Sequence, residues 1–192
     1  MPTGVHLRDV REQLFGAAER LLMTGGPSAL TSRAVTTEAG VAKGVLHRHF
    51  DDFDAFLADF VVDRATRMDA QARALTGKAG TGDVAENLAE AITAVFGSVA
   101  VAVVALVTFR DDLRRRLRET WPAGVPVLTE AVVMIEGYLA AEQRLGRIQN
   151  VDVEFVAPML IGAGHLLFAD RDTPPPAGAV RRMTGTVLGQ KH

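Results

Sequence analysis

The sequence contains no cysteine and few aromatic residues. Among its 192 residues there are nine Phe, one Tyr and one Trp. The absence of cysteine excludes disulfides, thiolate metal ligands and cysteine nucleophiles, and it leads us to expect a cytoplasmic protein. Aromatic residues favour strands, so their scarcity favours helix, as does the abundance of Ala, Leu, Arg and Glu. Because 48% of the residues are apolar, a disordered chain is excluded.

An excess of positive charge is also missing, because the formal net charge is −2. The charge is unevenly distributed, however: residues 1–50 carry +2, whereas residues 51–192 carry −4. A mildly basic amino-terminal segment before an acidic remainder is compatible with nucleic-acid binding. Catalytic patterns are absent as well, since the sequence has no HExxH, no GxSxG and no GxGxxG after a strand. We therefore expect no enzyme, no metal site and no cofactor.

Apolar side chains recur with helical spacing, and neither an alternating strand pattern nor an internal repeat occurs. The spacing predicts an all-α protein of about nine helices. They are expected at residues 7–24, 31–38, 42–49, 53–75, 83–109, 110–119, 127–145, 153–169 and 177–189. The expected capping residues are Thr31 or Ser32, both Asp51 and Asp52, Asp83, and Asp152.

Residues 91–109 form a run without a charged side chain, and this run has two interpretations. A membrane span needs about 20 apolar residues, which this length approaches. Its hydropathy is modest, however, because it contains Thr93, Gly97, Ser98, Thr108 and several alanines, and it lacks flanking Trp or Tyr. We favour a buried helix of a globular domain, with a membrane-associated helical protein as the alternative.

The glycine-rich segment 77–82 has the composition of a phosphate-binding loop. The Walker order GxxxxGK[ST] is absent, however, and no strand precedes the segment. We therefore favour a flexible connector between two helices.

The most informative segment is residues 34–50, which reads as a short helix, a turn at Gly40 and a second short helix. In the second helix Val41, Leu46 and Phe50 are expected to point into the protein. Lys43 and His47 are four residues apart and share the other face. A short helix with an exposed basic stripe fits the major groove of DNA.

From Val10 to Leu57 the chain resembles the TetR family of transcriptional regulators. The resemblance is carried by Leu14, Ala17-Ala18, Leu21, Gly25, Leu30-Thr31, Ala34-Val35, Glu38-Ala39-Gly40-Val41, Lys43-Gly44, Leu46, His49-Phe50 and Leu57. It implies a three-helix, helix-turn-helix DNA-binding head, which we place at residues 1–52. It also implies a larger helical body for effector binding and dimerisation, which we place at residues 53–192.

Individual roles in DNA binding follow from side-chain chemistry. Lys43 is suited to guanine or to phosphate, Gly44 lets the backbone approach the bases, and Val45 offers a contact to a thymine methyl. Hydroxyl and cationic groups nearby are candidates for phosphate contacts. The full predicted set is Thr31, Ser32, Arg33, Lys43, Gly44, Val45, His47, Arg48 and His49.

Three positions depart from the pattern that the resemblance implies. His47 stands where the family usually has a Tyr that contacts DNA, and Ala42 replaces a capping Ser or Thr. Phe53 replaces a Lys that clamps a phosphate, and Asp51 and Asp52 precede it. Because carboxylates near DNA repel phosphate, these two must face away, or affinity falls. We expect an atypical operator or weaker binding than is usual in the family.

The body is expected to hold the ligand and the dimer contacts. Its aromatic, Met and apolar residues suit an apolar or aromatic ligand with one or two polar groups. The candidate ligand-binding residues are Phe96, Val103, Phe109, Trp121, Met134, Tyr138, Phe155, Met159 and His165. The resemblance implies a homodimer built by the last two helices, with candidate interface residues Gly162, Gly164, Val180, Met183, Val187 and Leu188.

Together these features predict a one-component regulator with an operator DNA, a small-molecule effector and a second copy of the chain as its partners. The expected activity is repression that the effector relieves. Two other interpretations stay open from the sequence. One is the membrane-associated helical protein, and the other is a helical interaction protein whose head no longer binds DNA.

Overall fold

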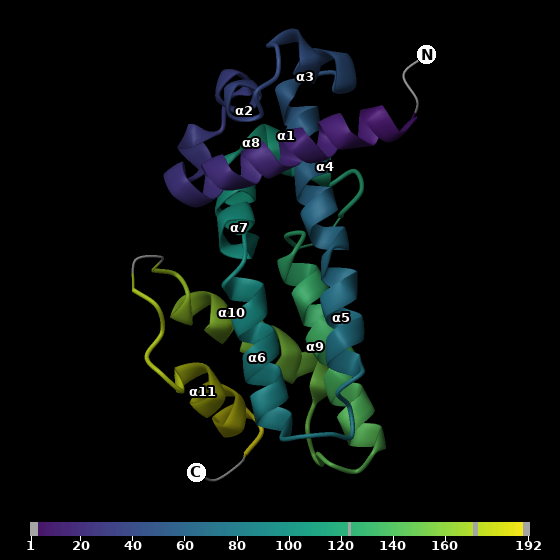
Figure 1. Ribbon diagram of the computed structural model, residues 1–192. Helices are drawn as coiled ribbons and strands as arrows, with labels where there is room; N and C mark the ends of the chain where they lie inside the picture. Colours follow the sequence, from purple (N-terminus) through teal and green to yellow (C-terminus); the bar gives the residue numbers. More distant parts are fainter. Residues whose placement is uncertain (1–3, 123, 171–172, 190–192) are drawn as a thin grey trace. The chain divides into compact units, whose positions relative to one another are not determined.

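A computed structural model describes residues 4–122, 124–170 and 173–189, and within these ranges the chain forms helices and no strands (Figure 1). One 3-10 helix, Pro27–Ala29, accompanies eleven α-helices. The α-helices are α1 (Gly4–Gly25), α2 (Ser32–Glu38), α3 (Gly44–His49), α4 (Phe53–Thr66), α5 (Met68–Thr76), α6 (Val84–Phe96), α7 (Ala100–Phe109), α8 (Asp111–Leu117), α9 (Leu128–Arg144), α10 (Val153–Leu167) and α11 (Ala179–Val187). The predicted all-α class is confirmed.

The helices number more than the nine expected because two long predicted helices are broken. The first breaks at Arg67, a turn residue between α4 and α5. The second breaks between Phe96 and Ala100, where the backbone N–H of Gly97 donates to the carbonyl of Thr93 at 2.8 Å. The Ser98 hydroxyl then accepts from the Ala100 N–H at 3.3 Å, so that α7 begins as a new helix.

The uncharged run is therefore divided between two helices. No single helix of the described ranges is long and apolar enough to cross a membrane, although α6 and α7 pass that test as a pair by length and composition.

The chain divides into two units, each with its own buried residues. The first comprises Met1–Asp63 and Ala102–Val125, and the second comprises Arg64–Val101 and Pro126–His192. The division falls within α4 and near the start of α7, so α8 groups with the amino-terminal helices. The assignment of DNA binding to residues 1–52 and of effector binding to residues 53–192 stays a prediction.

The first unit is organised around a cluster of phenylalanine rings. Phe15 of α1 lies with its ring centroid 6.1 Å from Phe50, 5.7 Å from Phe56 and 6.0 Å from Phe60. Phe50 and Phe56 meet edge to face at 5.1 Å. Such pairs add about 0.5–1.5 kcal/mol each to the burial of the rings. The cluster fixes the chain that follows α3 onto α1 and α4.

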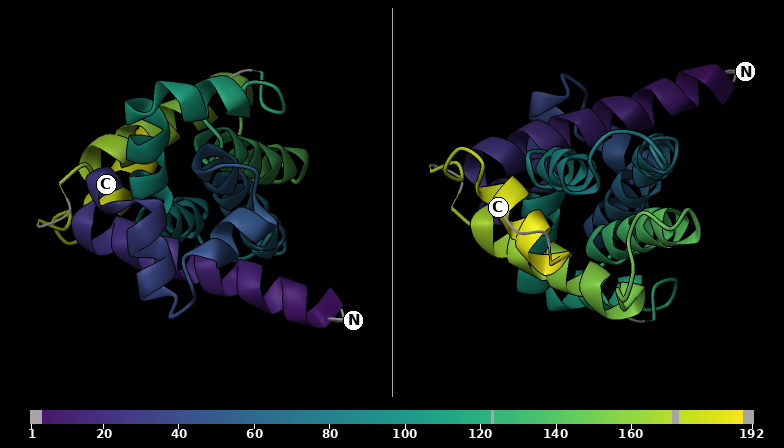
Figure 2. Two further views of the ribbon diagram at one scale, coloured as in Figure 1. Left: turned by 90° about the horizontal axis from the view of Figure 1, so that it is seen from above. Right: turned by 90° about the horizontal axis from the view of Figure 1, so that it is seen from below.

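In the second unit, α5 packs on α9, and α6 contacts α9, α10 and α11. Figure 2 shows α10 and α11 side by side. The α6–α11 contact includes a buried hydrogen bond of 2.8 Å from the Thr184 hydroxyl to the carbonyl of Ala85. The predicted caps Asp83 and Asp152 are confirmed, since their carboxylates accept from the N–H groups of Glu86 and Phe155.

Candidate nucleic-acid interface and ligand cavities

The helix α2 begins where the sequence predicted it. The Thr31 hydroxyl accepts a hydrogen bond from the N–H of Ala34 at 3.1 Å, which is the contact expected of a helix cap. Val35 and Thr36 are buried on its inner face, while Thr31 and Arg33 are exposed. Ser32 differs from the prediction for phosphate contact in one respect, because its Oγ is buried and has no partner among the described residues.

The turn after α2 depends on Gly40. This residue has φ +66, a conformation that L side chains rarely adopt, and its N–H donates to the Thr37 carbonyl at 3.0 Å. From α1, the Gln13 side chain donates to the carbonyl of Ala39 at 2.7 Å. These bonds fix the direction in which the chain leaves α2 and enters α3.

The helix α3 has a buried side and an exposed side. Leu46 is fully buried and Phe50, which follows the helix, is 5% exposed. Lys43, Gly44, His47 and Arg48 are exposed, and Val45 and His49 are partly exposed. The predicted residues thus lie on one short helix, labelled α3 in Figure 1, and on Lys43 immediately before it.

The helix α3 begins later than predicted. The sequence predicts a helix from residue 42, but α3 begins at Gly44, and no side chain caps it. Ala42 contributes only its carbonyl, which accepts from the Val45 N–H at 2.9 Å. A Cβ added at Gly44 meets no atom within 4 Å, so the backbone here faces open space. A DNA surface can approach this backbone more closely than it can approach a residue with a side chain.

The cations of α3 differ from those of α8 in their pairing. Neither Lys43 nor Arg48 forms an ion pair within the described ranges. On α8, Arg114 and Arg115 pair with Asp111 and Asp112 on the same helix. The α8 charges are therefore largely neutralised, whereas those of α3 are available to a phosphate or a base edge.

The acidic residues at the start of α4 are held by arginines of the same unit. Asp52 accepts from the Ala55 N–H at 2.6 Å and forms two bonds with Arg116, of 3.0 and 2.9 Å. The Ala55 N–H, followed by Arg116, holds the pKa of Asp52 below its ordinary value of 3.8. Asp54 pairs with Arg110 at 2.9 Å, and this guanidinium lies 5.5 Å from the ring of Phe53.

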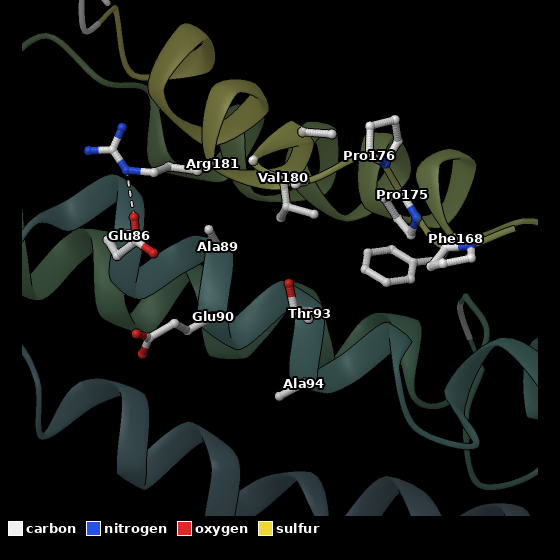
Figure 3. A pocket seen from close by; sticks show the side chains of 14 residues that line it. Glu86, Ala89, Glu90, Thr93, Ala94, Phe168, Pro175, Pro176, Val180 and Arg181 are labelled. Atoms are coloured by element: carbon white, nitrogen blue, oxygen red, sulfur yellow. Dashed lines mark hydrogen bonds and ion pairs between the residues drawn. The ribbon is translucent and has the colours of Figure 1, made fainter.

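Two hollows lie within the second unit. The smaller one, of about 240 Å³, is a pocket among α5, α6 and α9 that is open to solvent, and we call it the inner cavity. The larger one, of about 610 Å³, is an open groove between α6, the segment from Phe168 to Gly178, and the start of α11 (Figure 3). In Figure 3 the Glu86 side chain points to Arg181 across one end of this groove.

The predicted ligand-binding residues do not gather at one place. Met134 lines the inner cavity, and none of the predicted set lines the groove. Phe96, Val103 and Tyr138 are buried core residues, whereas Phe109, Phe155 and Met159 are 79%, 65% and 47% exposed. His165 contacts Phe96 edge to face at 6.2 Å, and Trp121 is partly exposed.

Sequence reasoning missed four polar residues of the inner cavity: Gln71, Lys78, Asn87 and Glu90. The signal for Asn87 was available, because it is the polar residue on the otherwise apolar buried side of α6.

The predicted interface residues also separate into two groups. A Cβ at Gly164 would lie 2.6 Å from the Phe96 ring, so this glycine serves the close approach of α10 to α6 within one chain. Val180 is buried too, at 9% exposure. Gly162 is exposed, and Met183, Val187 and Leu188 are partly exposed. The largest exposed apolar side chains of α10 are Phe155, Met159 and Leu166.

Comparison with known proteins agrees with this architecture. Residues 14–59 match the family of bacterial regulatory proteins, tetR family, and no curated protein matches the chain. The structure of Salmonella enterica GusR is similar, with 16% identity, 98% of each chain covered and a TM-score of 0.70. FadR from Bacillus subtilis in complex with stearoyl-CoA has 17% identity, a TM-score of 0.64, and coverage of 93% of this chain and 95% of that one.

A transcriptional regulator of the TetR/AcrR family from Thermobifida fusca is similar as well, with 17% identity and a TM-score of 0.62. The alignment covers 96% of this chain and 99% of that one. At these identities the structures establish a shared fold. Residues 14–59 thus match the tetR family of bacterial regulatory proteins, and the chain as a whole shares the fold of solved regulators of that family.

Proposed function

We propose that the chain is a homodimeric repressor that occupies a palindromic operator until a small effector releases it. Residues 1–52 bind DNA, with α3 in the major groove, and residues 53–192 bind the effector and the second copy. The observation that carries this proposal is the outer side of α3. There, Lys43 and Arg48 are exposed and have no acidic partner in the described ranges, beside a glycine that faces open space. Unpaired cations of this kind provide the phosphate contacts that dominate affinity for DNA.

A dimer suits this task because two α3 helices reach successive major grooves when they are about 34–36 Å apart. The outward side of α10 supports a dimer. Phe155, Met159 and Leu166 are 65%, 47% and 77% exposed, and the exposed Gly162 lies between them in sequence. Exposed apolar side chains grouped on one helix are typical of an interface.

The effector is a small apolar or aromatic molecule with one or two polar groups. The complex of Bacillus subtilis FadR with stearoyl-CoA supports the general idea that this fold binds a ligand. In the chain described here, we place the effector in the inner cavity, because it is lined by α5, α6 and α9 and combines apolar with polar side chains.

Release requires that the effector bind one conformation more tightly than the other. The α4–α5 segment is the covalent route from the DNA-binding helices to the inner cavity, and Arg67 interrupts it. A ligand that moves α5 therefore shifts the carboxyl-terminal end of α4. This shift changes the distance between the two α3 helices in the dimer.

Genomic footprinting of the purified protein tests this proposal. The expected result is protection of a small number of palindromic sites, and a reduction of transcription from the adjacent promoters when the protein is added. Binding without sequence preference, or an absence of protected sites, would contradict the assignment. The genes next to a protected site would also indicate the class of effector.

A further inference from the structure

The inner cavity has a small volume and one charged edge. At about 240 Å³ it lies below the range of about 300–1,000 Å³ that is typical of sites for drug-sized ligands. Leu75, Ala91 and Met134 contribute apolar surface, and Gln71 and Asn87 contribute carboxamides. Lys78 and Glu90 also line it and form an ion pair with each other.

Two carboxamide oxygens are available as hydrogen-bond acceptors in the inner cavity. The Oε1 of Gln71 is buried and has no partner among the described residues. Asn87 donates from Nδ2 to the carbonyl of Thr81 and to the hydroxyl of Tyr138, at 2.9 Å in each case. Its carboxamide oxygen is therefore the group left to meet a ligand.

The orientation of the Asn87 carboxamide is fixed by its partners. A backbone carbonyl only accepts hydrogen bonds, so the nitrogen of Asn87 must face Thr81. The hydroxyl of Tyr138, which receives the other bond, also bonds to Glu142, and Glu142 is itself fully buried. Exchanging the oxygen and nitrogen of Asn87 would leave Thr81 facing an oxygen, which is unfavourable.

The ion pair at the edge of the cavity is exchangeable. The Lys78 and Glu90 side chains are 45% and 56% exposed, so either one reaches water without leaving a buried charge behind. In Figure 3 the Glu90 side chain points away from Val180, which lines the groove. The Glu86 side chain, one turn earlier on α6, points to Arg181. Glu90 lines both hollows, and it is the carboxylate of α6 that lines the inner cavity.

We propose that the inner cavity selects a small ligand with an apolar body and a primary ammonium group, which takes the place of the Lys78 ammonium beside Glu90. This inference rests on the proposed effector role of the cavity and specifies the ligand class. An ammonium brings three donors to a site that offers the Glu90 carboxylate and the oxygens of Gln71 and Asn87 as acceptors. A carboxylate in the same place would face Glu90 and the oxygens of Gln71 and Asn87, and Lys78 would be its sole cationic partner among the lining residues.

Three probes of similar shape test the inference: 2-phenylethylamine, 3-phenylpropanoate and 2-phenylethanol, titrated calorimetrically into the full-length protein at pH 7. We expect 2-phenylethylamine to bind most tightly. Glu90→Gln should weaken it about tenfold, since a charge-assisted hydrogen bond is removed. Lys78→Met should strengthen it, because the competing ammonium is gone. Glu86→Gln is the matched control on the same helix and should leave binding unchanged.

Binding of 3-phenylpropanoate at least as tight as that of the amine would overturn the inference, as would equal losses in the two glutamine variants or no measurable binding of the amine. A mobility-shift assay with a footprinted operator distinguishes this failure from failure of the proposed function. If the protein binds the operator and no amine, the ligand class alone is wrong. If it binds the amine and no operator, the regulatory role is wrong while the cavity assignment holds.

Discussion

Asp52, which precedes α4, and Arg116, on α8, form a bidentate ion pair with nitrogen–oxygen distances of 3.0 and 2.9 Å. The same carboxylate caps α4 through the N–H of Ala55. The TetR resemblance implies a cationic phosphate clamp at the following position, where this chain has Phe53. A carboxylate beside that position would repel DNA, and its pairing with Arg116 reduces the repulsion. The pair therefore removes part of the obstacle that the sequence posed to DNA binding.

The pairing of Asp52 predicts a pH-dependent contribution to stability. We expect Asp52→Asn to lower Tm at pH 7, because asparagine keeps the cap and loses the charge interaction with Arg116. The pKa of Asp52 in the folded protein lies below its ordinary value of 3.8, mainly through the Ala55 N–H and then Arg116. A lowered folded-state pKa stabilises the protein above the unfolded value and ceases to do so as the pH falls through the folded value.

The difference in Tm between Asp52→Asn and the parent should therefore be constant near neutrality and vanish as the pH falls below 3.8. Thermal unfolding followed by circular dichroism between pH 7 and acidic pH measures it. Asp51→Asn is the matched control, because it removes a neighbouring exposed carboxylate. A difference that persists unchanged at the acidic end would show that the charge of Asp52 is not involved.

The exposed cations of α3 predict the salt dependence of operator binding. Lys43→Ala combined with Arg48→Ala should weaken binding and flatten its dependence on salt, by about 0.9 in the log–log slope for each phosphate that is no longer neutralised. Fluorescence anisotropy with a footprinted operator, at several salt concentrations, provides both quantities. The pair Arg115→Ala and Arg118→Ala removes the same charge from the α8 region and should change the slope less. Equal flattening by both pairs would remove α3 from the reading role.

The two sides of α3 should respond differently to truncation. Leu46 is fully buried, so Leu46→Ala should lower the free energy of unfolding by about 2–5 kcal/mol. His47 is exposed, so His47→Ala should change it by less than about 0.5 kcal/mol while weakening operator binding. Urea denaturation and anisotropy on the same preparations separate the two effects. Comparable losses of stability would mean that His47 is part of the core.

Much of the fold could be predicted because local rules decide it. Thr31, Asp52, Asp83 and Asp152 cap helices as their position before an apolar stretch indicates. The breaks at Arg67 and after Phe96 were missed because helical spacing of apolar residues continues across them. Periodicity reports which face is buried, and it does not report whether the axis is continuous.

The candidate sites show the same limit. The outer stripe of α3 follows from residues a few positions apart, so spacing predicts it. The Asp52–Arg116 pair joins residues 64 positions apart, and sequence spacing carries no information about such contacts. Likewise, Gly164 is a small residue of the kind expected where two helices of a dimer approach closely, but it packs on Phe96 of its own chain. Only the packed structure distinguishes a glycine that faces a partner from one that faces the core.

The buried carboxylate of Glu142 holds the glycine-rich loop at 77–82 in place. We therefore expect a large loss of stability when its partner Arg147 is replaced. Glu142 is fully buried, its Oε2 lies 3.1 Å from an Arg147 nitrogen, and its Oε1 accepts from the Gly80 N–H at 3.3 Å. Arg147→Met leaves this carboxylate without its cation, which should cost about 3 kcal/mol of unfolding free energy, the lower end for a buried pair because the arginine side chain is 29% exposed. Urea denaturation measures the loss.

Adding Glu142→Gln to that variant should recover part of the loss, since a neutral carboxamide is less costly to bury than an unpaired carboxylate. If the double variant is no more stable than Arg147→Met alone, the arginine stabilises the loop through the carbonyls of Thr81 and Gly82, to which it also donates. The loop is therefore expected to act as a structural connector tied to α9, rather than as a phosphate-binding loop.

The outward side of α10 predicts the oligomeric state. Light scattering of the parent should give twice the chain mass of 20.5 kDa. Phe155→Asp combined with Leu166→Asp should give the monomer mass, because two carboxylates would otherwise be buried at the contact between copies. Leu145→Asp is the matched control, since Leu145 is 57% exposed and lies outside α10, and it should leave the dimer intact.

The monomeric variant should also lose operator affinity while keeping its helical content, because a single α3 contacts one half-site. A parent that is monomeric at micromolar concentration would exclude the two-site mechanism, and a dimer that tolerates both α10 substitutions would place the interface on another face.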